Sequence, residues 1–125
     1  MGDHLHKRRL DLGLDQKQAA AQLGVDPESL RNWETGRMEP ACRFYPALLD
    51  FLGYNPLPEG QTRGQRIFRM RVTKGWSRKA LAKIAGVDEA TVSRLEDNRP
   101  GMATRAVQAL LAALGAEPIK AIPPQ

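Results

Sequence analysis

Few side chains of this chain could carry covalent or metal chemistry. Cys42 is the only cysteine and has no histidine near it in the sequence, so neither a catalytic thiol nor an internal disulfide is expected. His4 and His6 lie two residues apart, which points them to different sides of a helix and disfavours a metal pair. The sequence shows no nucleophile–base set, metal cluster or phosphate-binding loop. We therefore expect no enzymatic activity, no metal, no cofactor and no small-molecule ligand.

The charged side chains offer a different chemistry, which is attraction to phosphate. The formal net charge is +5 at pH 7, but it is unevenly divided. Residues 1–62 carry seven Lys and Arg against nine Asp and Glu, a net of −2, whereas residues 63–125 carry twelve against five, a net of +7. Because phosphate neutralisation dominates affinity for DNA, the second half should supply most of the nonspecific attraction to a nucleic acid.

The sequence contains an internal repeat at an offset of 62 residues with no gap. Eighteen aligned pairs are identical, and they gather at expected turns and apolar positions. Gly24-Val25-Asp26 aligns with Gly86-Val87-Asp88, for example. We expect two domains, residues 1–53 and 64–116, joined by a short linker of residues 54–63 that contains proline and glycine and followed by a tail of residues 117–125.

Each copy is expected to contain helices alone, so the predicted fold is all-α, with two tandem five-helix bundles. In copy one, helices are expected at about 16–23 and 27–35, and in copy two the equivalent of the latter is expected at about 89–97. Pro46 divides the end of copy one into a short fourth helix and a fifth, because proline can open a helix but not lie inside one. The expected N-cap residues are Asp15, Asp26, Ser77 and Asp88.

Two helices joined by a tight turn place demands on particular positions, and both copies meet them. A small residue must let the helices approach, and Ala20 and Ala82 provide it. The turn needs a residue that accepts positive φ, and Gly24 and Gly86 provide it. The second helix of each pair must present apolar residues to the core, and these are Leu30, Trp33, Val92 and Leu95.

The segments 13–25 and 30–37 resemble the lambdoid-phage repressor, Cro and Xre family, and residues 75–99 resemble it less closely. The resemblance covers both copies and omits only the linker and tail. It implies two repressor-like helix-turn-helix bundles whose third helices enter the DNA major groove, and hence a transcriptional regulator that binds double-stranded DNA. Copy two departs from the family's Glu-x-Gly-Arg, because it has Glu96-Asp97-Asn98-Arg99 there.

Within that resemblance, exposed residues early in the third helix of each copy are expected to contact bases. Asn32 is suited to adenine, Arg94 to guanine, and Ala90 or the methyl of Thr91 to a thymine methyl. The expected base-contacting residues are Glu28, Ser29, Arg31, Asn32, Ala90, Thr91, Ser93 and Arg94. The expected phosphate-contacting residues are Gln16, Lys17, Arg37, Arg43, Arg78, Lys79, Arg99 and Arg105. An ordinary solvated surface is the alternative interpretation for each.

The pairs Arg9/Glu34 and Arg71/Glu96 are charges that both copies place among apolar residues. Either the arginines contact DNA, or each pair is a structural ion pair that ties the first helix to the end of the third. We favour the ion pair, since a glutamate near phosphates would be repelled and the resemblance implies such a pair.

Two hypotheses for the function remain. In the first, both copies bind one DNA site. In the alternative, which is a protein-interaction regulator of the antitoxin or anti-activator type, copy two binds DNA and copy one binds a protein partner or a second copy of itself. The Phe44-Tyr45-Pro46 segment could provide that contact, or it could be part of the core. No apolar stretch approaches the roughly 18–20 residues of a membrane span, so a cytoplasmic protein without a membrane partner is expected.

Overall fold

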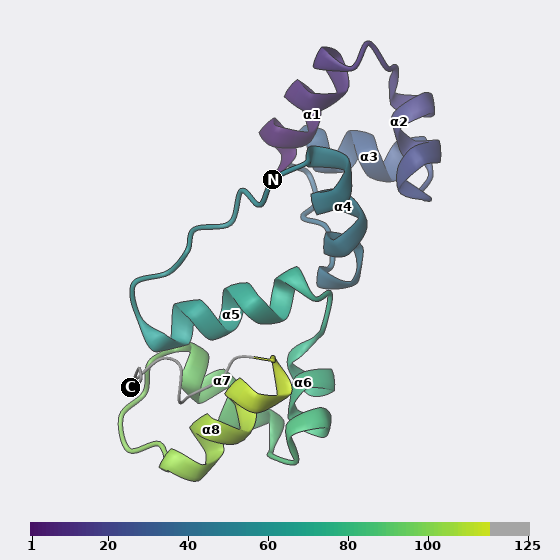
Figure 1. Ribbon diagram of the computed structural model, residues 1–125. Helices are drawn as coiled ribbons and strands as arrows, with labels where there is room; N and C mark the ends of the chain where they lie inside the picture. Colours follow the sequence, from purple (N-terminus) through teal and green to yellow (C-terminus); the bar gives the residue numbers. More distant parts are fainter. Residues whose placement is uncertain (116–125) are drawn as a thin grey trace. The chain divides into compact units, whose positions relative to one another are not determined.

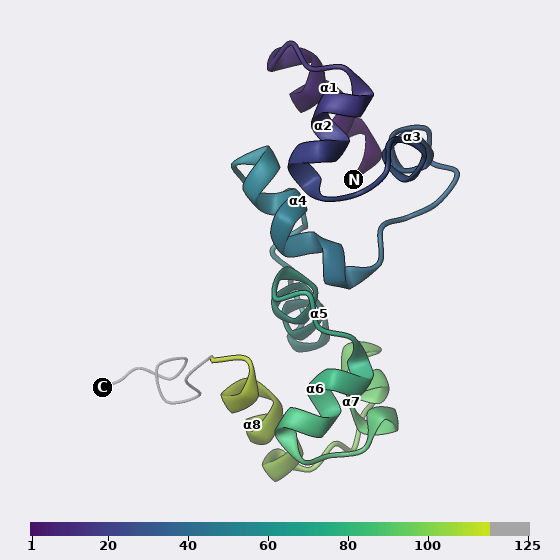
Figure 2. The same ribbon diagram turned by 90° about the vertical axis from the view of Figure 1, so that its right-hand side faces the viewer.

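The computed structural model describes residues 1–115 of the chain. Contacts divide the chain into two compact units, Met1–Pro56 (unit 1) and Leu57–Gln125 (unit 2), each with one copy of the repeat. The described residues form eight α-helices and one 3-10 helix, and they contain no strand (Figures 1 and 2). The tandem all-α architecture expected from the sequence is thus confirmed. None of these helices is long and apolar enough to cross a membrane. The expected tail, residues 117–125, lies outside the described residues.

Unit 1 contains the five helical segments expected for copy one. They are α1 (Gly2–Asp11), α2 (Gln16–Leu23), α3 (Pro27–Glu34), the 3-10 helix η1 (Cys42–Phe44) and α4 (Tyr45–Leu52). Each α-helix contributes to the core a side chain that is at most 1% exposed, namely Leu5, Ala20, Leu30 and Leu48. Burial of this apolar surface holds the short helices together, since helices of eight to ten residues are marginal by themselves.

The turn between α2 and α3 follows from local sequence. Asp15 and Gln18 form a capping box at the start of α2, with distances of 2.7 and 2.9 Å. Gly24 ends this helix in the left-handed conformation, at φ 73°. Asp26 then caps α3 by accepting a hydrogen bond from the backbone N–H three residues later, at 2.7 Å. Because Ala20 is fully buried and small, the two helices can pack closely at this turn.

Unit 2 repeats this arrangement with four α-helices in its described part. They are α5 (Arg63–Thr73), α6 (Arg78–Ala85), α7 (Glu89–Glu96) and α8 (Thr104–Ala113). Ser77 caps α6, and Gly86 ends it at φ 75°. The best buried side chains of the core are Ile67, Leu81, Val92, Leu95 and Leu110.

Unit 2 differs from unit 1 in its last helix and in a helix cap. Pro46 lies in the first turn of α4, where its missing N–H interrupts the helical bonding that would extend from η1. The aligned residue of unit 2 is Gln108, and α8 runs unbroken past it, so one helix takes the place of the expected fourth and fifth. Asp88 is the N-cap residue of α7, as expected, but its side chain accepts no capping hydrogen bond.

The first helix of each unit packs directly on the end of the third. A Cβ atom at Gly2 would overlap a backbone carbonyl of α3, and one at Gly64 would overlap the carbonyl of Leu95. Asn98 stands where unit 1 has a glycine, adopts φ 57°, and accepts a hydrogen bond from the Gly64 N–H at 3.0 Å. These contacts give a physical reason for the identical glycines in the two copies.

Candidate nucleic-acid interface

One side of α3 faces the core, and the opposite side faces solvent. Leu30 and Trp33 are 1% and 5% exposed and point inward. The outward side is formed by residues spaced three and four apart, as one face of a helix requires. The residues of this outward side are Glu28, Arg31, Asn32 and Thr35. Together with Arg37 they line a hollow of about 350 Å³.

The expected base-contacting residues of unit 1 fall on or beside this face. Glu28 and Arg31 are exposed, whereas Ser29 and Asn32 are half-buried. The Asn32 Nδ2 atom lies 3.9 Å from a methionine sulfur in the following loop. Thr35 was not expected, although its spacing of seven residues from Glu28 places it on the same face. Its hydroxyl donates to the carbonyl of Arg31 at 2.9 Å, which leaves the methyl group and oxygen lone pairs for other contacts.

The outward face of α7 is built differently. Ala90 and Arg94 are exposed, and Thr91 and Ser93 are half-buried. Ser93 is held toward α6, because its Oγ accepts a hydrogen bond from Arg78 Nη1 at 3.4 Å. An exposed acidic residue, Asp97, occupies the position that threonine has in unit 1, and it was not among the expected base-contacting residues.

Glu34 lies at the centre of a hydrogen-bond network that joins α1, α2 and α3. Its side chain is 2% exposed and makes two bonds with Arg9, of 2.7 and 3.0 Å. Gln16 Nε2 donates to the same carboxylate at 3.1 Å, and His6 Nδ1 lies 3.2 Å from it. Burial raises the pKa of Glu34, but the hydrogen bonds from Arg9, Gln16 and His6 outweigh it and lower that pKa below the ordinary 4.5.

Glu96 holds the equivalent position in unit 2, with two arginines instead of one. Arg71 donates to it at 2.6 and 3.0 Å, and the side chains of Arg71 and Glu96 are 7% and 2% exposed. Arg78 Nε donates at 3.0 Å, and its side chain is 39% exposed. Arg9 and Arg71 therefore lie inside ion pairs that fix the position of α3 and α7.

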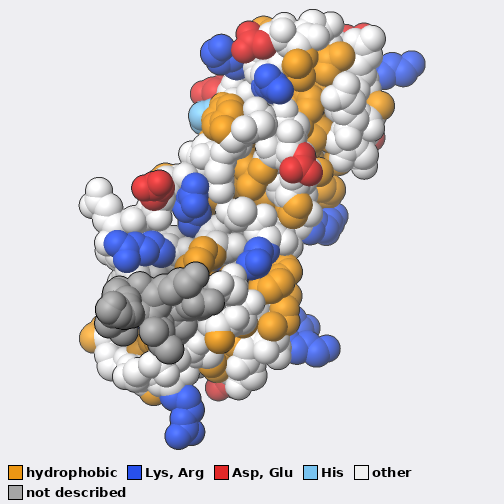
Figure 3. Space-filling model, viewed as in Figure 1, with side chains coloured by type: hydrophobic (Ala, Val, Ile, Leu, Met, Phe, Trp, Pro, Cys, Tyr) orange, Lys and Arg blue, Asp and Glu red, His pale blue; other side chains and the backbone are white. Residues whose placement is uncertain are grey.

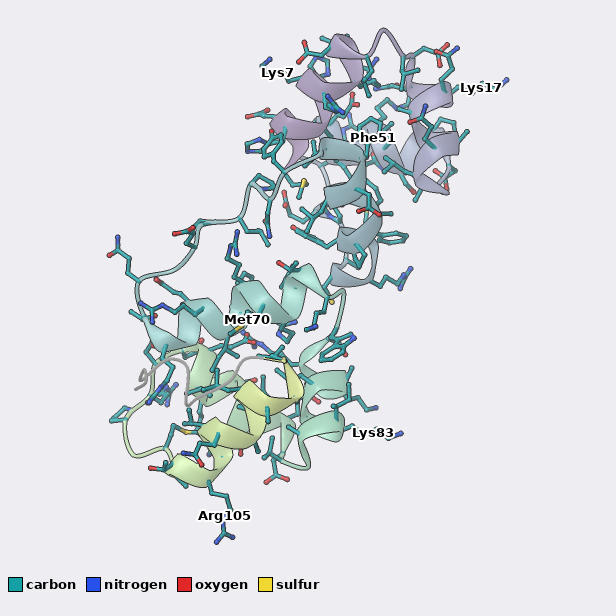
Figure 4. All side chains as sticks on the ribbon, in the orientation of Figure 1. Lys7, Lys17, Phe51, Met70, Lys83 and Arg105 are labelled. Carbon is teal, nitrogen blue, oxygen red and sulfur yellow. The ribbon has the colours of Figure 1, made fainter. Side chains whose placement is uncertain are left out.

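Most of the expected phosphate-contacting residues are exposed in both units. Six of the expected phosphate contacts are exposed, namely Lys17, Arg37, Arg43, Lys79, Arg99 and Arg105. In Figure 4 the side chains of Lys17 and Arg105 extend away from the ribbon into solvent. Gln16 and Arg78, at the first positions of α2 and α6, are half-buried because they bind Glu34 and Glu96.

The two units carry different surface charge. Residues 1–56 hold seven Lys and Arg against eight Asp and Glu, whereas residues 57–115 hold eleven against five. Figure 3 shows acidic and basic side chains interspersed on unit 1, while basic side chains predominate on the visible described surface of unit 2. The stronger attraction to phosphate therefore belongs to unit 2.

The aromatic segment of unit 1 packs mainly on its own unit. The ring of Phe44 lies 5.2 Å from that of Trp33, and the Arg43 guanidinium lies 4.7 Å from the Phe44 ring centre. Tyr45 is 9% exposed. Cys42 is a half-buried free thiol. Among residues 1–115 there is no group of three or more side chains that could hold a metal ion.

Comparison with known proteins assigns this geometry to a family. A family model described as a helix-turn-helix domain matches the chain twice, over residues 1–59 and 64–120. Each match contains one pair of helices joined by a glycine turn, α2 with α3 or α6 with α7. No curated protein and no solved structure matches the chain.

Proposed function

The chain belongs to the helix-turn-helix domain family through both of its halves, and on this basis we propose that it is a cytoplasmic transcriptional regulator that binds duplex DNA sequence-specifically. The helices α3 and α7 lie in the major groove in this proposal. The observation that carries it is the pairing of an outward polar face with flanking cations. In unit 1 Arg37 lines the same hollow as that face and Lys17 is an exposed cation at the start of α2, and the aligned residues of unit 2 are the exposed Lys79 and Arg99.

The chemistry of the face suits base edges. Asn32 can bind adenine bidentately, Glu28 can accept from the cytosine amino group, and Arg94 can donate twice to guanine. The surrounding lysines and arginines bind phosphates and set the register of the helix in the groove. The buried ion pairs at Glu34 and Glu96 position both helices and are not themselves part of the contact with DNA.

Both units act on one DNA site in this proposal. The residues expected as the linker, 54–63, span about 30 Å if fully extended, at roughly 3.3 Å per residue. In the structure residues from Leu57 on belong to unit 2, so the full span requires residues 57–62 to detach from that unit. Successive major-groove sites on one face of the duplex lie about 34 Å apart, and the units themselves add reach. Tethering makes the second binding event intramolecular, which raises the affinity of the whole chain above that of either unit.

The alternative, in which unit 1 binds a protein, draws its support from the charge of that unit, because residues 1–56 hold one more acidic than basic side chain. The contact between Phe44 and Trp33 takes up much of the apolar segment that would serve such a partner. Light scattering with and without DNA tests whether unit 1 binds a second copy of the chain, because such self-association requires a mass above that of one chain.

In-vitro selection from a random duplex pool tests the proposal, followed by binding assays with single variants. Arg94→Ala and Asn32→Ala are each expected to weaken binding by about 1–3 kcal/mol and to relax different positions of the selected site. Lys7→Ala is the matched control, because Lys7 is an exposed cation on α1 that pairs with a neighbouring aspartate. Failure to enrich any sequence contradicts sequence-specific binding. If Asn32→Ala changes neither the affinity nor the selected sequence, base recognition by unit 1 is contradicted.

A further inference from the structure

The turns, the ion pairs to the first helix and the backbone bonds after the helix have matching lengths around α3 and α7. The turn glycines have φ of 73° and 75°, and the backbone bond that closes each turn, Val25 N to Ala20 O in unit 1, is 3.0 Å in both units. Arg9 and Arg71 reach their glutamates at 2.7 and 2.6 Å. The backbone bond after the helix, Arg37 N to Asn32 O in unit 1, is 2.9 Å in both. The two helices are therefore presented alike.

The outward faces, by contrast, share no residue. At the four face positions, unit 1 has Glu28, Arg31, Asn32 and Thr35, and unit 2 has Ala90, Ser93, Arg94 and Asp97. The two sets carry the same net charge of zero, since each has one cation and one anion. A difference between the two faces in base preference must then come from the pattern of side chains and not from the net charge of the face.

The patterns favour different bases. Unit 1 presents an amide, a carboxylate and a guanidinium, which suit adenine, cytosine and guanine in the major groove. Unit 2 presents a guanidinium at the amide position and a methyl group at the carboxylate position, which suit guanine and thymine. Ser93 is held by Arg78 at 3.4 Å and so faces α6 at the position where unit 1 exposes Arg31.

From these observations we infer that the protein's DNA site is bipartite and non-palindromic, with two half-sites of different sequence, and that the four face positions of each unit determine the difference. Thr35 and Asp97 thereby become specificity-determining residues alongside the residues earlier in each helix. The inference rests on the proposed function and gives the chemical class of its substrate. A chain whose two DNA-binding units prefer different bases recognises a site with two different half-sites. Two units with the same preference recognise a site in which one half-site occurs twice.

An exchange of faces tests the inference. The variant E28A/R31S/N32R/T35D gives unit 1 the face of unit 2 without changing the net charge. Selection with the wild-type chain is expected to return two different half-sites, and selection with the variant is expected to return two copies of the unit 2 half-site. The variant should bind the wild-type site at least about tenfold more weakly, since each lost bidentate contact is about 1–3 kcal/mol.

The controls separate sequence reading from folding and from bulk charge. Circular dichroism and thermal unfolding establish that the variant folds, and the reverse exchange, A90E/S93R/R94N/D97T, tests the inference independently. The variant D3Q/K7R/D11T/D50A replaces four exposed residues of α1 and α4, away from the face, by the aligned residues of unit 2. It should change affinity without changing the selected sequence.

Each outcome has one meaning. Identical half-sites from the wild-type chain, a single half-site, or an unchanged selected sequence after both exchanges overturns the inference while leaving DNA binding intact. Absence of any enriched sequence with the wild-type chain overturns the proposed function itself.

Discussion

Replacement of the buried Glu96 by glutamine should destabilise unit 2 strongly while leaving unit 1 unaffected. Glu96→Gln keeps the size of the side chain but removes the negative charge that faces Arg71 and Arg78. Arg71 is 6% exposed and donates two of its hydrogen bonds to this carboxylate, so its charge is left buried with a neutral partner. The hydrogen bonds that Arg71 still donates, to a backbone carbonyl and to the glutamine oxygen, compensate only in part for the lost negative charge.

The expected loss is about 3–5 kcal/mol, which is the usual effect of removing one partner of a buried ion pair. Arg71 accounts for most of it. The side chain of Arg78 is 39% exposed, so solvent screens its charge and its share is about 1 kcal/mol or less. A unit of about 60 residues has a total stability of roughly 3–9 kcal/mol, so the loss removes a large part of it.

The two tryptophans allow each unit to be followed separately. Trp33 lies in unit 1 and Trp76 in unit 2, and the chain has no other tryptophan. Urea unfolding of Glu96→Gln in a Trp33→Phe background reports unit 2, and the same substitution in a Trp76→Phe background reports unit 1. The midpoint should fall in the first series and stay constant in the second.

Two further variants decide whether the reasoning holds. Arg78→Ala should lower the stability of unit 2 by about 1 kcal/mol or less, because its charge is screened. The double variant R71M/E96L should recover most of the loss, since a buried pair can be replaced by apolar groups of similar volume. A loss below about 1 kcal/mol for Glu96→Gln, or a double variant less stable than the single one, would refute the buried-charge argument.

Three more outcomes are expected, each measured by urea unfolding of the unit concerned. Asp26→Ala should lower the urea midpoint of unit 1, whereas Asp88→Ala should change that of unit 2 less, because only Asp26 accepts a capping hydrogen bond; equal effects would contradict the role of the cap. Gly64→Ala should destabilise unit 2 by about 1–3 kcal/mol through overlap with the end of α7, while Arg66→Ala at an exposed position of the same helix should have little effect. Because the folded-state pKa of Glu34 lies below the ordinary 4.5, ionised Glu34 stabilises unit 1 above that pH, and this stabilisation is lost as the pH falls below it. Glu34→Gln should therefore flatten the dependence of the stability of unit 1 on pH in this range. An unchanged pH dependence would refute the stabilising role of the ionised carboxylate.

Local sequence determined the units and their turns. Gly24 and Gly86 occupy the left-handed conformation that the turn requires, and such a backbone needs no tertiary contact to be predicted. The capping residue Asp26 and the core position Leu30 likewise follow from short-range spacing. The repeat extended these predictions from one copy to the other, and the family match covers both.

The ion pairs of Glu34 and Glu96 with the first helix were predicted from the sequence, but the further partners of these glutamates were decided by tertiary structure. That Gln16 and Arg78 bind the buried glutamates depends on how three helices meet, and residue types at a helix start do not reveal it. The same packing turns Ser93 toward α6 and adds Thr35 to the outward face. Side-chain direction is set by the neighbours against which a helix packs.

The spatial closeness of α1 to the end of α3 explains the identical glycines of the two copies, which the sequence shows without a reason. Gly2 and Gly64 are small because a backbone carbonyl occupies the place of a side chain. The sequence by itself thus determined which helices form and where they turn, since these depend on spacing and backbone preference. Tertiary structure decided which polar groups are bound internally and which remain exposed, because burial and hydrogen bonding are properties of the packed helices together.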